Sequence, residues 1–223
     1  MYPLLKKGYD VVGFDFSSEM VKEAKSNLQE WGYDPDNVVE GDLADSIPFD
    51  GQFDAVIALG SVPTVPDPHE AVKRIHSVTK PDGLVLLQLR NLLFNLYTLN
   101  EYTYSFFFEY LLDDVELSDK EMSKVRSRLQ GAFSMDSHTD QKLSELDGSG
   151  SFHNPLTIDE DLASMALDVQ ELHFHHYHAL PPEFENTFQD LMREQSLKLE
   201  RPTDWKGYFM ASAFLVESIV QPK

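Results

Sequence analysis

The chain has 223 residues, 42% hydrophobic and 12% aromatic, which is enough to fold around one core as a single domain over residues 1–223. Its 38 acidic and 18 basic residues give a formal charge of −20, which disfavours nucleic acid and anionic lipid as partners. It has no cysteine, which excludes disulfides and thiolate chemistry, and no apolar run long enough to span a membrane. We expect a cytoplasmic protein with a cationic or neutral ligand, although acids also simply keep a surface hydrated.

Strand and helix patterns alternate from the start of the chain. Tyr9 to Phe14 is predicted as a buried strand, and Ser17 as the N-cap of a helix that ends at Gly32. The apolar face of that helix is predicted to be Met20, Ala24, Leu28 and Trp31. A short strand, Val38 to Glu40, and a continuous apolar strand, Phe53 to Leu59, follow.

A second helix and another strand continue this alternation. Asp67 is predicted as an N-cap, with a proline at the first helical position and Glu70 as the capping-box glutamate. The predicted buried face of this helix is Val72, Ile75 and Val78. A turn over residues 80–83 leads into a strand from Leu84 to Leu89. Apolar strands separated by amphipathic helices are typical of an α/β fold with a mostly parallel sheet covered on both faces.

Ligands of such sheets bind at the carboxyl ends of the strands. The predicted ends are Asp15-Phe16, Asp42-Leu43, Leu59-Gly60-Ser61 and Arg90-Asn91. A carboxylate can accept hydrogen bonds from vicinal ribose hydroxyls, and a second one, one strand over, can accept from an exocyclic amine. A solvated loop explains either acid alone, whereas two acids in register, each before a large apolar residue, favour a nucleoside site.

The order and spacing of four segments resemble those of class I S-adenosylmethionine-dependent methyltransferases, of the small-molecule type that includes glycine and sarcosine N-methyltransferases. The segments are GYDVVGFDFSSEMVKEAK, VVEGDLADSIPF, GQFDAVIALGSV and AVKRIHSVTKPDGLVLLQLRN. The resemblance implies a Rossmann-like sheet with Asp168 to His178 as sixth strand and Tyr208 to Glu217 as an antiparallel seventh strand beside Leu84 to Leu89. It implies S-adenosyl-L-methionine as the cofactor and a small-molecule N or O atom as the methyl acceptor.

Carried over by position, the resemblance assigns roles at the strand ends. Asp15 would bind the ribose hydroxyls, Asp42 the adenine amine, and Leu43 the adenine ring or its N1 edge through the backbone. The residues expected beside the adenine are Phe16 and Met20, and those beside the methionine end are Leu59, Gly60 and Ser61.

One part of the family pattern is absent from the sequence. The family places a central first strand and a glycine-rich loop earlier, and residues 1–7 match only the end of the helix that follows them. Without that strand, backbone groups of two neighbouring strands would be unpaired. We therefore interpret the sequence as an N-terminally truncated methyltransferase, with a non-catalytic binding subunit as the alternative. An NAD-dependent dehydrogenase also places an acid after its second strand, but Asp42 and the tail FMASAFLVE favour a methyltransferase.

Residues 92–150 form an insertion at the position where this family often has a substrate lid. Five of its side chains are predicted to form one helical stripe that packs on the sheet: Phe94, Tyr97, Tyr104, Phe108 and Leu111. The remaining tyrosines can face a pocket. A capping box at Ser118 predicts a helix to about Gln130 that buries Met122, Val125 and Leu129, and Ser134 to Ser151 is predicted to be mobile.

The histidine-rich segment HFHHYH, residues 173–178, can be interpreted in two ways. In a strand His173 and His175 share one face, and two such imidazoles can chelate a metal. The spacing supplies no third ligand, so we assign no metal, and a histidine-rich strand end near the substrate mouth explains the segment equally well. One of these histidines, or His153, can act as a base. No spacing distinguishes them, and methyl transfer often needs only alignment, so no catalytic residue is assigned.

Overall fold

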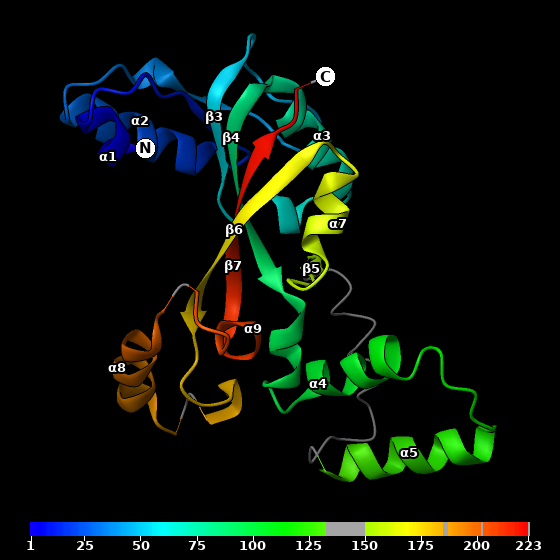
Figure 1. Ribbon diagram of the computed structural model, residues 1–223. Helices are drawn as coiled ribbons and strands as arrows, with labels where there is room; N and C mark the ends of the chain where they lie inside the picture. The colour runs from blue at the N-terminus through cyan, green and yellow to red at the C-terminus, as the bar shows by residue number, and fades with distance from the viewer. Residues whose placement is uncertain (133–149, 185–186, 202, 223) are drawn as a thin grey trace.

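The computed structural model describes residues 1–132, 150–184, 187–201 and 203–222. Its strands form two sheets, a parallel pair β1-β2 and a five-stranded sheet with the order β3-β4-β7-β6, in which β5 also pairs with β4 (Figure 1). The strands are β1 (Gly13–Asp15), β2 (Val38–Glu40), β3 (Phe53–Ala58), β4 (Thr79–Asn91), β5 (Phe152–His153), β6 (Leu167–Tyr177) and β7 (Ala211–Val220).

The helices flank these sheets and extend beyond them (Figure 1). The α-helices are α1 (Tyr2–Lys6), α2 (Ser18–Glu30), α3 (Pro68–Val78), α4 (Glu101–Phe106), α5 (Asp119–Ala132), α7 (Ile158–Ala163), α8 (Gln189–Leu199) and α9 (Gly207–Met210). The 3-10 segments are η1 (Pro35–Asn37), η2 (Val62–Thr64), η3 (Leu92–Leu96) and η6 (Pro182–Phe184), and η4 (Phe107–Leu111) is a short π-helix. Among the described residues, no helix combines the length and apolarity that crossing a bilayer requires.

The five-stranded sheet is mixed, as the family resemblance implies. β3, β4 and β5 are parallel, while β7 is antiparallel to both β4 and β6. The predicted sixth and seventh strands are therefore confirmed, displaced by one residue and by three residues respectively. The register aligns Leu84 with Ile219 and Arg90 with Ala213, which is the placement expected beside the strand from Leu84 to Leu89.

The main core lies on one face of this sheet, against α3 and α7. Alternate side chains of β4 and β7 are buried there, and both helices contribute residues to the same cluster. Its members include Val72, Ile75, Val85, Leu87, Leu89, Ile158, Leu162, Phe214 and Val216. The opposite face carries half-buried side chains: Leu84, Leu86, Leu215 and Ile219. The sheet is thus packed more completely on one side than on the other, within the described part of the chain.

The helix caps predicted from the sequence are confirmed, whereas two predicted strands differ in extent or burial. The Ser17 hydroxyl accepts a hydrogen bond from the Met20 amide at 3.3 Å. The predicted strand from Tyr9 to Phe14 is regular only as β1, and β3 is largely exposed rather than buried. The buried face of α2 consists of Val21 and Leu28, while Met20 and Trp31 are 56% and 45% exposed.

The insertion differs most from expectation. Its aromatic residues do not form one helical stripe, because η3 ends at Leu96 and α4, which η4 continues directly, begins only at Glu101. The Asn100 side chain caps α4 by accepting from the Tyr102 amide at 3.0 Å. Ser118 and Glu121 form the predicted capping box at α5, but α5 buries none of its side chains. The prediction for Ser134 to Ser151 falls mostly outside the described residues.

The sheet edges bear on the expectation of a missing central strand. In the described residues β1 pairs with β2 alone, and β3 pairs with β4 alone. One backbone edge of β1 and one of β3 therefore have no strand partner there. The absence of a first strand and its glycine-rich loop stays a prediction.

Candidate functional site

The candidate site begins where β1 and β2 end side by side. Their parallel register pairs Asp15 with Glu40, and the Gly41 amide donates to the Asp15 carbonyl at 3.0 Å. Asp42 follows directly, so the pairing brings the two predicted site carboxylates to the same end of one small sheet. This is the relation that the sequence predicted from strand ends alone.

Each of these carboxylates is oriented by the turn that follows it. Oδ1 of Asp15 accepts from the Ser17 amide at 2.9 Å, and Oδ1 of Asp42 accepts from the Ala44 amide at 2.8 Å. Asp15 is half-buried and Asp42 is exposed. Each group keeps its second oxygen available to accept from a ligand hydroxyl or amine, because no other bond to it is found among the described residues.

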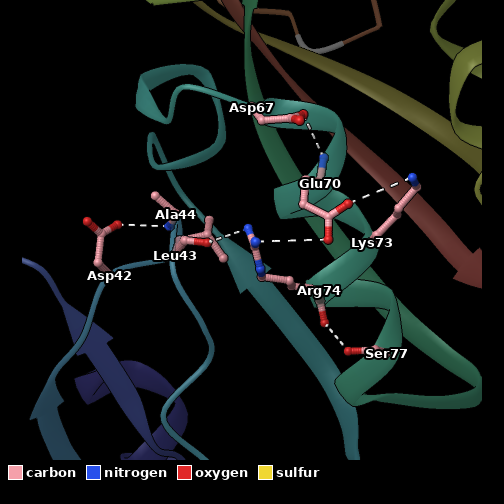
Figure 2. A network of polar contacts seen from close by, with 8 residues as sticks. All are labelled: Asp42, Leu43, Ala44, Asp67, Glu70, Lys73, Arg74 and Ser77. Atoms are coloured by element: carbon pink, nitrogen blue, oxygen red, sulfur yellow. Dashed lines mark hydrogen bonds and ion pairs between the residues drawn. The ribbon is translucent and has the colours of Figure 1, made fainter.

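Helix α3 supports the loop that carries Asp42. Nη1 of Arg74 donates to the Leu43 carbonyl at 3.3 Å, and its Nη2 lies 3.9 Å from Glu70 (Figure 2). Glu70 also lies 3.8 Å from Lys73, and its amide donates to the N-cap Asp67 at 2.9 Å. Figure 2 shows this loop between the two-stranded sheet and α3, with Arg74 joining the loop to the helix.

Three large apolar side chains at the predicted cofactor positions are exposed. Phe16, just after β1, is 75% exposed, Met20, in the first turn of α2, is 56% exposed, and Leu59, just after β3, is 65% exposed. Exposed apolar side chains gathered beside oriented polar groups are typical of a ligand surface. Leu43 differs, since its side chain is 6% exposed and belongs to the main core, so only its backbone can reach a ligand.

A cavity of about 430 Å³ opens at the carboxyl end of β4. Gly60, which follows β3, lines it together with residues from the insertion and the C-terminal half. The remaining lining residues are Pro63, Gln88, Leu89, Arg90, Phe94, Asn95, Thr98, Asn100, Tyr102, Phe152, Pro182, Ser212 and Ala213. The insertion therefore forms part of the wall of this cavity. A second hollow of about 390 Å³ lies along α5 and includes none of the strand ends.

The cavity mixes aromatic rings with polar groups. The guanidinium of Arg90 lies 5.9 Å from the centroid of the Phe152 ring, and the Phe152 ring contacts Tyr102 edge-on at 5.9 Å. At Gly60 the backbone has φ +74°, and a side-chain carbon added there would have Oε1 of Gln88 as its nearest neighbour, at 4.0 Å. The backbone between the strand ends and the cavity is thus open to a ligand.

The histidines considered as bases lie elsewhere. Phe152 lines the cavity, so the next residue of that strand, His153, points to the other face. Burial lowers the pKa of His153 from 6.5 to about 4 despite the nearby charge of Asp161, so its imidazole is neutral at neutral pH. None of residues 173–178 is among the cavity-lining residues of the described chain.

Residues 1–87 match the family model described as "Methyltransferase domain". Residues 1–87 are thus similar to a class I S-adenosylmethionine-dependent methyltransferase domain. The matched part of the chain contains every strand end at which the sequence predicts the cofactor, from Asp15 to Ser61.

Similarity to individual proteins covers different shares of this chain. It is 33% identical over 92 residues to the putative methyltransferase YqeM of Bacillus subtilis, covering 40% of this chain and 36% of that protein. It is 28% identical over 169 residues to the ubiquinone biosynthesis O-methyltransferase of Pseudomonas paraeruginosa, covering 72% of this chain and 66% of that one. The chain thus spans between about a third and two thirds of the length of these relatives.

A solved structure has the same fold over almost the whole chain. The CcbJ methyltransferase from Streptomyces caelestis aligns with 99% of this chain and 78% of its own, with a TM-score of 0.54 and 13% sequence identity. At this identity the similarity shows the fold alone. It covers the insertion and the antiparallel C-terminal strand as well as the part that the family model matches.

Sequence reasoning missed two contributors to the site. Arg74 was counted only within an amphipathic helix, although its long side chain reaches the loop of Asp42. The cavity wall was also missed, because Pro182, Ser212 and Ala213 come from segments far along the chain. Asn100, the N-cap of α4, was the one residue whose type could have signalled that a new helix begins there.

Proposed function

We propose that this methyltransferase binds S-adenosyl-L-methionine across the ends of β1, β2 and β3 and transfers its methyl group to a small molecule bound in the cavity at the end of β4. The observation that carries the proposal is the pair of turn-oriented carboxylates, Asp15 and Asp42, at adjacent strand ends. When bound, the cofactor supplies an electrophilic methyl group on a sulfonium.

The described residues fit the parts of this cofactor by their chemistry. The free oxygen of Asp15 would accept from the ribose hydroxyls, and that of Asp42 from the adenine amine. Phe16, just after β1, and Met20, in the first turn of α2, are both exposed and would cover the adenine. The buried side chain of Leu43 leaves its backbone amide as the group that can meet the N1 edge.

The acceptor side is supported by the position of Gly60. This glycine lies two residues after the end of β3 and also lines the cavity, so the two proposed binding regions meet there. The cavity holds the acceptor between aromatic rings and amide groups, which favours a small, partly apolar molecule that carries the N or O nucleophile. Alignment of the nucleophile with the methyl group is the main contribution of such a cavity, so no general base is required.

The test is isothermal titration calorimetry with S-adenosylhomocysteine on the wild-type chain, Asp15→Asn, Asp42→Asn and Glu23→Gln. Glu23 is an exposed acid of α2 and serves as the matched loss of charge. We expect each strand-end variant to weaken binding by about 1.5–3 kcal/mol, roughly 10- to 150-fold, with Glu23→Gln unchanged. Equal affinity in all four folded proteins would contradict the proposed orientation of the cofactor.

A further inference from the structure

A cluster of one imidazole and two carboxylates lies on the less covered face of the five-stranded sheet. Glu171 and His173 come from β6, and Glu217 comes from the neighbouring β7. One ligand-type atom from each residue lies within 4.8 Å of the others. None of the three lines the cavity, so the cluster is distinct from the proposed methyl-transfer site.

An irregularity in β6 brings this cluster together. The register pairs Val169 with Ser218 but Glu171 with Glu217, which leaves Gln170 as the extra residue of a β-bulge. Val169 packs against the main core with the buried Ser218, whereas Glu171 lies on the opposite face. In a regular strand the two residues would share a face. The bulge therefore directs Glu171 to the face of His173 and Glu217.

The arrangement places two acids directly opposite each other on antiparallel strands. Like charges in such a pair destabilise a sheet unless something neutralises them. In the described part of the chain, the only basic group with an ion-pair contact to either acid is His173, whose Nε2 lies 3.4 Å from Glu217 and 3.7 Å from Glu171. The three side chains are 31–51% exposed, so an ion from solvent can reach them.

We propose that Glu171, His173 and Glu217 form a binding site for a divalent transition-metal ion, with Zn²⁺ as the best match. Zinc is held by imidazole nitrogen and carboxylate oxygen at about 2.0–2.2 Å, and tetrahedral geometry then separates two ligand atoms by about 3.3–3.5 Å. The distance from His173 to Glu217 already has this value, and the distance to Glu171 is only slightly longer. Mg²⁺ and Ca²⁺ prefer oxygen ligands alone, so the imidazole disfavours them.

The bound ion would join β6 to β7 and leave one coordination position for water. Its positive charge replaces the repulsion between Glu171 and Glu217 by attraction to a common centre. The sequence alone gave no third ligand, because Glu217 is 44 residues from His173 along the chain and meets it only through strand pairing. The site is proposed independently of methyl transfer, since it uses none of the residues at the strand ends.

The experiment is calorimetric titration of the metal-free chain with Zn²⁺, for the wild type, His173→Gln, Glu217→Gln and His175→Gln. His175 is the matched control, since it is a half-buried histidine two residues away on the same strand but outside the cluster. We expect one equivalent to bind the wild type and His175→Gln equally, and at least tenfold more weakly in the other two variants. Equal zinc binding in all four proteins, or none in the wild type, would overturn the site.

Thermal unfolding adds a readout that does not depend on affinity alone. Glu217→Gln removes the repulsion from Glu171, so the metal-free variant should have the same or a higher melting temperature than the wild type. Zn²⁺ should raise the melting temperature of the wild type but not of this variant, because a ligand stabilises only the state that binds it. A zinc-dependent rise of the same size in Glu217→Gln would assign the ion to other residues.

Discussion

The backbone amide of Gly41 donates to the carbonyl of Asp15 at 3.0 Å, which joins the end of β2 to the end of β1. The same glycine has no room for a side chain. A carbon added to it would lie 2.8 Å from Cγ of Pro48 and 3.3 Å from Cδ2 of Phe14. The position of Asp42, the next residue, thus depends on a close approach that only glycine permits.

We predict that Gly41→Ala destabilises the protein and weakens cofactor binding. Overpacking against a proline ring and a phenyl ring costs about 1–3 kcal/mol, and the displaced strand end carries Asp42 with it. Denaturant unfolding and calorimetry with S-adenosylhomocysteine measure the two effects. Gly131→Ala is the control, because Gly131 lies within α5 with open space around it, and alanine should stabilise that helix by up to about 1 kcal/mol. Unchanged stability in Gly41→Ala would show that Pro48 moves away freely.

We also predict that Arg74→Met weakens cofactor binding without abolishing it. Methionine keeps an apolar stem against α3 but removes the donor to the Leu43 carbonyl, so the loop of Asp42 becomes less well held. The loss of one hydrogen bond of this kind, about 1 kcal/mol, corresponds to roughly fivefold weaker affinity. Lys73→Met is the matched control, since Lys73 is exposed and its one ion pair among the described residues is with Glu70, at 3.8 Å. Identical affinities in the two variants would contradict a supporting role for Arg74.

Local signals predicted well the end of the fold where we propose that the cofactor binds. Ser17 and Asp67 cap helices through their own side chains, and both caps are present as expected. β2 has the predicted bounds, because a short apolar run between a proline turn and Gly41-Asp42 leaves little alternative. The strand ends that carry Asp15 and Asp42 follow from these local patterns.

Tertiary contacts decided what the sequence did not show. The prediction of one aromatic stripe was wrong because the hydroxyls of Thr98 and Thr103 both donate to the Asn95 carbonyl, and the chain turns there before α4 begins. The spacing of apolar residues cannot reveal such a turn, because apolar residues continue through it. Likewise, Met20 suits a helix face, but the neighbouring Val21 packs against α1 and β2 instead. The cavity and the proposed metal cluster depend on strand pairing between distant segments, which spacing cannot reveal.

The unpaired strand edges give a prediction about association. In the described part of the chain, β3 pairs on one side only, and Ile57 on this strand is 43% exposed. Open edges with apolar side chains favour pairing with another chain. We expect concentration-dependent association in light scattering, reduced by Ile57→Lys. Lys22→Ile is the reverse control, because it adds an apolar side chain on the exposed side of α2 and not at a strand edge. We expect this variant to change association less than Ile57→Lys does. A wild-type protein that stays monomeric at high concentration would contradict association through the edge of β3.

Protonation of His153 should make the protein less stable in mild acid. Burial lowers the pKa of this imidazole from 6.5 to about 4, and Asp161 only partly opposes the effect. The unfolded chain takes up a proton near pH 6.5 whereas the folded protein does so only near pH 4, so the free energy of unfolding falls as the pH falls through this window. The contribution reaches roughly 3 kcal/mol at pH 4 and is absent above about pH 7.

The variant His153→Leu isolates this contribution from the other titrating groups. Leucine has a similar volume, and Nδ1 of His153 has no hydrogen-bond partner among the described residues, so the substitution breaks no hydrogen bond at Nδ1 there. We expect urea unfolding to show a smaller loss of stability between about pH 7 and pH 4 in the variant than in the wild type. His69→Leu, at an exposed position of α3, should behave like the wild type. Parallel stability curves for wild type and His153→Leu would mean that the folded protein opens this site to water before His153 becomes protonated.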